Sequence, residues 1–148
     1  MKTESTLQDV TDQPDLWVEG DPVRPGLGPE FKSALGRRVY GLLDPGGDWG
    51  AFCCTARTIG VPRSVAELDR MTDLTGMIIV PYTVWSLRRG AGKEIIRALI
   101  ATTQPGERVV TLSPKTEMAA RFHDRNGATR IGKWSEAVNF EYPTGGAQ

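Results

Sequence analysis

Apolar residues follow two different spacings in the middle of the chain, and the difference predicts alternating strands and helices. Residues 77–85 (MIIVPYTVW) form an apolar run that is rich in β-branched and aromatic side chains and too short to span a membrane, so it predicts a buried strand. Residues 93–103 (KEIIRALIATT) instead place aliphatic side chains at helical spacing. A second strand at 107–113 and a second helix at 114–127 complete a strand–helix–strand–helix unit.

The segments on either side of this unit predict shorter elements. Two strand-like runs, 38–43 and 49–57, are joined by a turn with proline and glycine (DPGGD) and predict a hairpin. Ser64 is placed to cap a helix over SVAELDRM, with Glu67 completing a capping box. The remaining expected elements are a strand at 16–18, a helix at 30–35 and a strand at 137–142. This order predicts an α/β fold in which a mixed, mostly antiparallel central sheet carries helices on both faces.

The length of the chain bounds its domain organisation. A chain of 148 residues is close to the usual size of one domain, so we expect a single domain over residues 15–143. Residues 1–14 have no hydrophobic period and are expected to form a disordered tail, and residues 144–148 a flexible one. The polar, acidic start of the chain is unlike a signal or transit peptide, which favours the cytoplasm.

Composition narrows the class of partner. Eighteen basic and eighteen acidic side chains cancel, and no basic run interleaves with aromatic residues, so neither nucleic acid nor a membrane is an expected partner. Cys53 and Cys54 are adjacent, which suits opposite faces of a strand better than a disulfide, so both are expected to be reduced. No metal-ligand spacing accompanies them, and no metal is expected. A small molecule is the favoured partner, and a homodimer stays open.

The strongest candidate for binding chemistry is the glycine turn RRGAG. Gly90 and Gly92 lie where a predicted strand turns directly into a predicted helix. With no Cβ atoms in the way, N–H groups at the start of that helix can point at an anion, which the positive end of the helix dipole also favours. The turn therefore predicts a phosphate cradle. Arg88 and Arg89 either bind that phosphate or are solvated surface groups.

The same strand, glycine turn and helices resemble the acyl-coenzyme-A core of the GNAT acetyltransferase superfamily. In that superfamily the turn begins with Gln or Arg, where this chain has Leu87, and its two later small residues match Gly90 and Gly92. The resemblance implies that a coenzyme A thioester is the substrate, with its pyrophosphate on the turn. Its pantetheine arm would lie on the main chain of the preceding strand, so the side chain of Thr83 should matter little. The implied binding residues are Tyr82, Thr83, Val84, Arg88, Arg89, Gly90, Ala91, Gly92 and Lys93.

A narrower resemblance, over residues 38–142, is to the catalytic domain of malonyl-CoA decarboxylase, a branch with the GNAT fold. It is carried by the segments VPRSVAEL, VPYTVWSL, TLSP, FHDRNGA and NFEY in this order, although the family's long insertion between the two catalytic segments is missing. It implies that Ser113 and His123 are a catalytic pair. Both also have a structural alternative, since Ser113 before Pro114 could cap a helix and His123 could stabilise its C-terminal end.

Three functions remain open, and decarboxylation of a malonyl thioester leads. The strand at 77–85 carries no acid to take a proton from an amine, whereas decarboxylation needs only donors on the thioester oxygen and a proton donor. Ser113 and His123 suit these roles, but ten residues of straight helix would separate them by ~15 Å, so Ser113 must lie at the strand end. The alternatives are a GNAT N- or O-acetyltransferase that uses acetyl-CoA and a small-molecule acceptor, and a non-catalytic module that binds acyl-CoA or an acyl-carrier protein.

Overall fold

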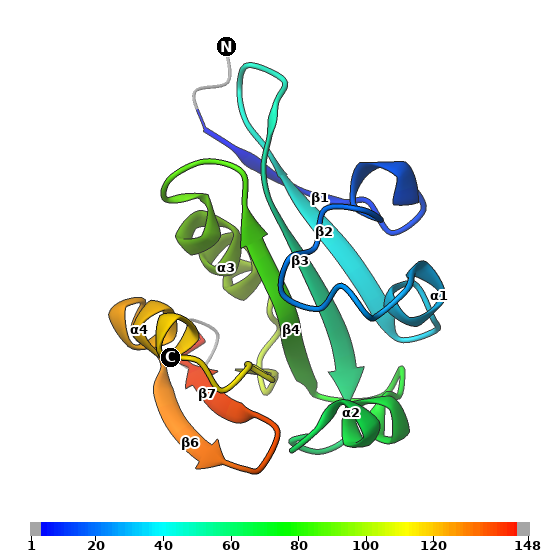
Figure 1. The fold of residues 1–148 in the computed structure, drawn as a ribbon, viewed down its shortest axis with the longest axis vertical. Helices are drawn as coiled ribbons and strands as arrows, with labels where there is room; N and C mark the ends of the chain where they lie inside the picture. The colour runs from blue at the N-terminus through cyan, green and yellow to red at the C-terminus, as the bar shows by residue number, and fades with distance from the viewer. Residues whose placement is uncertain (1–3, 145–148) are drawn as a thin grey trace.

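The computed structural model describes residues 4–144, which form one mixed sheet with helices packed against it (Figure 1). In this part of the chain the sheet has seven strands in the order β1-β2-β3-β4-β5-β7-β6, and only β4 and β5 run parallel. The strands are β1 (Thr6–Asp9), β2 (Arg37–Leu43), β3 (Trp49–Thr58), β4 (Ile78–Ser86), β5 (Arg108–Val110), β6 (Thr129–Lys133) and β7 (Val138–Tyr142). The helices are α1 (Pro29–Lys32), α2 (Val65–Met71), α3 (Ala91–Ala101) and α4 (Glu117–Arg125), with a 3-10 turn η1 (Pro14–Leu16). The predicted fold class is confirmed.

Helices cover both faces of the sheet and bury apolar side chains on each. On one face Leu68 of α2 joins a core built on the centre of β2, β3 and β4. On the other face α3 packs Ile95 and Leu99 against the same strands. Cys53 belongs to the α3 face and Cys54 to the opposite face, and both thiols are free and buried. The expectation of two reduced cysteines on opposite faces is confirmed.

The N-terminal region departs from the sequence-based expectation. Residues 6–9, expected to lie in a disordered tail, form β1 and pair antiparallel with β2. The strand expected at 16–18 is wrong, because Pro14–Leu16 form η1 and Trp17 is buried, with its indole N–H donating to Val10 O at 2.9 Å. The expected C-terminal tail lies outside the described residues apart from Thr144.

The start of α4 also differs from the prediction. Thr116 is the N-cap of this helix, and its hydroxyl accepts the N–H of Ala119 at 3.2 Å. The expected capping role of Ser113 is therefore wrong. Ser113 instead continues the strand direction, because it exchanges main-chain hydrogen bonds of 2.9 and 3.0 Å with Val138 of β7.

Candidate functional site

Strands β4 and β5 part soon after they begin and leave a cleft between them. They pair over two residues at the start of each strand, and within the described chain the last main-chain hydrogen bond across the gap runs from Leu112 N to Pro81 O at 3.2 Å. Strand β4 also shifts register against β3 at Tyr82, which is left without a cross-strand partner. A cavity of about 230 Å³ lies beyond the point where the strands part.

The structure brings six of the sequence-predicted site residues to this cavity. Ser113 lies at the strand end and α4 begins only at Glu117, so the long straight helix that would have separated Ser113 from His123 does not form. An apolar wall from α4, which includes Met118 and Phe122, lines the other side. The six predicted residues are Tyr82, Thr83, Val84, Gly92, Ser113 and His123.

A side chain from the glycine- and proline-rich loop at residues 20–28 bridges the two parting strands. Arg24 Nε donates to Tyr82 O at 3.1 Å, and its Nη2 donates to Leu112 O at 2.9 Å. Burial lowers the pKa of Arg24, although a guanidinium keeps its charge in proteins. Arg24 therefore takes the place of strand-to-strand hydrogen bonds at the edge of the cleft and fixes its width.

The same loop carries a buried carboxylate. Asp21 accepts the hydroxyl of Thr83 at 2.8 Å and forms an ion pair of 2.7 Å with Lys32 of α1. Burial alone would raise the pKa of Asp21, but hydrogen bonds from Lys32, the main chain and Thr83 lower it below its ordinary value. Asp21 is thus a carboxylate held in its ionised form by hydrogen bonds, and it is a poor base. The hydroxyl of Thr83 therefore has a structural partner in Asp21, and the expectation that this side chain matters little for binding the ligand stays a prediction.

The glycine turn has the geometry of an anion cradle. Gly90 is the N-cap of α3 with φ of 82°, a left-handed conformation that favours glycine. Among residues 4–144 no acceptor bonds the N–H of Gly92 or Lys93, so two amides at the positive end of α3 are free. A Cβ on Gly92 would lie 2.9 Å from Ser86 Oγ and 3.1 Å from Phe122 Cε1, so a larger residue here must displace side chains where α3 meets α4.

Arg88, in contrast, is already engaged by carboxylates. Its Nε donates to Asp44 at 2.7 Å and its Nη1 to Glu94 at 2.7 Å. The Arg88 guanidinium holds the pKa of Asp44 at about 2, far below its usual range. Arg89 and Lys93 are exposed and have no ion-pair partner in the described part of the chain, so they supply the available positive charge of the turn.

His123 lies inside the molecule rather than on its surface. The residue is 6% exposed and packs against the rings of Phe140 and Tyr142. Its Nδ1 lies 2.7 Å from Tyr142 Oη. Burial lowers the pKa of His123 to about 4, so the imidazole is neutral at pH 7. Burial also raises the pKa of Tyr142, which keeps the phenol protonated.

The sequence-based prediction missed several residues of the site. Tyr142 could have been found, because alternation along β7 places Val138, Phe140 and Tyr142 on the inner side. Arg24 lies in a loop without any periodic pattern, so no local signal marks it. The missed residues are Asp21, Arg24, Thr111 and Tyr142.

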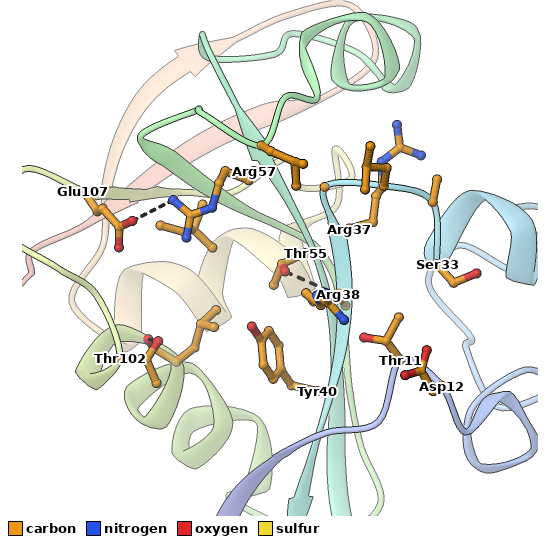
Figure 2. Close-up of a pocket in the computed structure, with 16 residues that line it drawn as sticks. Thr11, Asp12, Ser33, Arg37, Arg38, Tyr40, Thr55, Arg57, Thr102 and Glu107 are labelled. Carbon is orange, nitrogen blue, oxygen red and sulfur yellow. Dashed lines mark hydrogen bonds and ion pairs between the residues drawn. The ribbon is translucent and has the colours of Figure 1, made fainter.

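A second cavity, of about 350 Å³, lies on the α3 face of the sheet (Figure 2). Tyr40 stands near its centre, and Arg57 is joined to Glu107 by an ion pair of 2.6 Å. Arg38 pairs with Asp9 at 3.6 Å. The lining includes none of the residues predicted for the site. All three of its guanidinium groups are already paired, since Arg37 also forms an ion pair with Asp69 at 2.6 Å, so this cavity offers less to a ligand than the cleft does.

Two further observations concern the described residues. No three His, Cys, Asp or Glu side chains gather within residues 4–144 where they could hold a metal ion. In the same range, every helix is too short or too polar to cross a membrane.

Comparisons with known proteins establish the fold. No protein-family model and no curated protein matches the chain. A structure of histone acetyltransferase HPA2 and related acetyltransferase from Corynebacterium glutamicum is similar with a TM-score of 0.53 and 16% identity, over 95% of this chain and 97% of that one. The structure of Tetrahymena GCN5 has a TM-score of 0.55 and 12% identity, over 84% of this chain and 81% of that one. The structure of AtaTR bound with AcCoA has a TM-score of 0.53 and 12% identity, over 94% of each chain.

Proposed function

Starting from the GNAT acetyltransferase fold that the chain shares with these structures, we propose that the protein transfers an acyl group from a coenzyme A thioester to an amine or hydroxyl group of a small molecule. Acetyl-CoA is the donor that we propose first. One observation carries the proposal: a single cavity is lined by Gly92 of the glycine turn, by the free edge of β4, and by Ser113 and His123.

Each part of a coenzyme A thioester finds suitable groups here. The free N–H groups of Gly92 and Lys93 suit the pyrophosphate, as helix N-termini commonly do. Beyond Pro81, β4 no longer pairs with β5. On this side the pantetheine arm can bond the main chain of Tyr82–Val84 through its amides, in the way that an added strand would. Tyr82 O is already bonded to Arg24, and Thr83 and Val84 pair with β3 on their other side. The ligand would therefore pair with the main-chain groups of this segment that face away from β3.

The chemistry of transfer follows from the groups around the cavity. The acceptor nitrogen or oxygen attacks the thioester carbonyl, the C–S bond breaks, its electron pair leaves on sulfur, and the acceptor loses one proton. We assign a neutral donor role to His123, in which Tyr142 O–H donates to Nδ1 and Nε2–H faces the thioester. The residues that line the cavity include no carboxylate, so the acceptor's proton passes to water.

The sequence alone favours decarboxylation, but two findings favour transfer instead. The similar solved structures include acetyltransferases, and no comparison supports the resemblance to malonyl-CoA decarboxylase. Decarboxylation also requires a proton for the enolate carbon. With a pKa of about 4, His123 carries that proton in only about one molecule in a thousand at pH 7.

The test is to incubate the protein with acetyl-CoA or malonyl-CoA and a panel of amines and alcohols, and to follow free thiol and product masses. We expect acceptor-dependent release of coenzyme A and an acceptor heavier by one acetyl group. Gly92→Val, which fills the meeting point of α3 and α4, should lose this activity. Conversion of malonyl-CoA to acetyl-CoA without acceptor would establish decarboxylation. Tight binding without turnover, tested also with an acyl-carrier protein, would establish a binding module.

A further inference from the structure

A chain of buried hydrogen bonds runs from β7 to the cleft. The N–H of Phe140 donates to Thr111 Oγ1 at 3.1 Å, and Thr111 Oγ1 lies 2.7 Å from Ser113 Oγ. Thr111 is 1% exposed and Ser113 is 3% exposed, so bulk water does not reach the hydroxyl of Thr111. Ser113 is the end of this chain that lines the cavity.

This series of hydrogen bonds arises because the regular pairing of β5 with β7 ends at Thr111. Its N–H still donates to Phe140 O at 2.8 Å, as in an ordinary ladder. Its C=O, however, accepts Nδ2 of Asn139 at 2.9 Å, so the N–H of Phe140 bonds the threonine hydroxyl. Asn139 is fully buried, and its Oδ1 accepts Trp134 Nε1 at 2.7 Å, which fixes the orientation of the amide.

The direction of the hydroxyl hydrogens follows from this geometry. An N–H can only donate, so Thr111 Oγ1 accepts from Phe140. The hydroxyl hydrogen of Thr111 then needs an acceptor of its own. Among the described residues, Ser113 Oγ is the acceptor within bonding distance. If Ser113 donated to Thr111 instead, the hydrogen of Thr111 would be buried without an acceptor, which is unfavourable.

We infer that Thr111 holds Ser113 as a hydrogen-bond donor toward the acyl thioester, which makes Thr111 a positioning residue for acyl transfer. The inference rests on the proposed function. With Thr111 donating to its oxygen, Ser113 keeps its own hydrogen for the cleft, and donation along the chain strengthens that hydrogen bond. Negative charge develops on the carbonyl oxygen and then on sulfur as the C–S bond breaks, and a fixed donor stabilises it. The hydrogen stays on Ser113 throughout, and no bond forms to its oxygen.

Turnover of three variants tests this assignment. Ser113→Ala should lower kcat by ~10²-fold, as loss of a donor to the developing charge does. Thr111→Val should lower kcat by about tenfold with the KM for acetyl-CoA little changed, since one net hydrogen bond is worth roughly that factor. Thr111→Ser keeps the hydroxyl and should restore most of kcat. In a Ser113→Ala background, Thr111→Val should cause no further loss.

A matched control separates positioning from stability. Thr58 is also fully buried, and its hydroxyl donates to Gly60 O at 2.7 Å, but it does not line the cleft. Thr58→Val should lower the stability and leave kcat unchanged. Equal kcat for Thr111→Val and wild type, or losses that multiply in the double variant, would overturn the assignment.

A second readout does not depend on turnover. Acetyl-CoA labelled with carbon-13 at the carbonyl should show a downfield shift on binding, because a donor polarises the C=O group. This shift should shrink in Ser113→Ala and Thr111→Val and persist in Thr58→Val. If the wild type binds acetyl-CoA but the carbon-13 shift is the same in wild type, Ser113→Ala and Thr111→Val, the inference is refuted and the proposed function stays intact. A wild-type protein that neither binds nor transfers acetyl groups refutes the proposed function, and the inference with it.

Discussion

Replacement of His123 by glutamine tests whether a neutral, buried imidazole stands at the cleft. Glutamine keeps a polar group beside Tyr142 Oη but cannot titrate. His123 is the only histidine of the chain, so the comparison with wild type isolates one imidazole. Carboxylates titrate equally in both proteins and cancel in the difference.

The magnitude follows from the lowered pKa. The imidazole pKa is about 4 in the folded protein and 6.5 in the unfolded chain, so the unfolded chain binds the proton more tightly. Stability is therefore lost as the pH falls below about 6.5, and the loss levels off below about 4. From pH 7 to pH 4 the wild type should lose about 3 kcal/mol of unfolding free energy that His123→Gln keeps, and roughly half of that by pH 5.5.

The assay is urea unfolding at pH 7, 5.5 and 4, followed by tryptophan fluorescence for both proteins. The difference between their unfolding free energies should shrink or reverse in favour of His123→Gln as the pH falls. If the two proteins respond to pH in parallel, within about 1 kcal/mol, the imidazole is not held neutral and the donor role assigned to it fails.

Three further variants test the glycine turn and the cleft. Gly92→Val should weaken acetyl-CoA binding more than tenfold in calorimetry, because its side chain would meet Phe122 and Ser86. Gly90→Ala, which meets no atom within 4 Å but keeps a positive φ, should cost about 1–2 kcal/mol of stability and much less affinity. Arg24→Met removes both hydrogen bonds across the parting strands and should lower the unfolding free energy by about 2 kcal/mol or more, with weaker acetyl-CoA binding. Unchanged affinity in Arg24→Met would show that the bridge does not shape the cleft.

Much of the fold could be predicted because its signals are local. The apolar run that forms β4, the aliphatic spacing of α3, and Ser64 as the cap of α2 each lie within a few residues of the element they specify. The edge strand β1 could not, because TLQD gains its structure from pairing with β2 across a long stretch of chain. The cap of α4 could not be placed either, because Ser113 pairs with Val138 of β7 and the helix is capped three residues later, by Thr116.

The residues of the candidate site likewise include some that the sequence could suggest and some that it could not. Gly92 is marked by its place between strand and helix, and Ser113 and His123 by resemblance, so sequence could suggest them. Arg24 reaches the cleft from a loop, and its partners lie 58 and 88 residues away along the chain. The lowered pKa of His123 depends on the rings that bury it, which no spacing in the sequence reveals.

The parting of β4 and β5 also bears on how a ligand enters and leaves. The sheet has two parts, β1–β4 and β5–β7, and β4 joins β5 through two residue pairs and the hydrogen bond from Leu112 N to Pro81 O. Arg24 and the Arg57–Glu107 ion pair also connect the two parts. Helix α3 covers the junction of β4 and β5 on one face of the sheet, where Ile96 packs against Val109, so it supports both parts of the sheet. Small rotations of β5–β7 relative to β1–β4, on the microsecond to millisecond scale of collective motions, would widen the cleft without unfolding either part. A long thioester would then need no separate lid, and the strength of the arginine bridge would set how quickly the site empties.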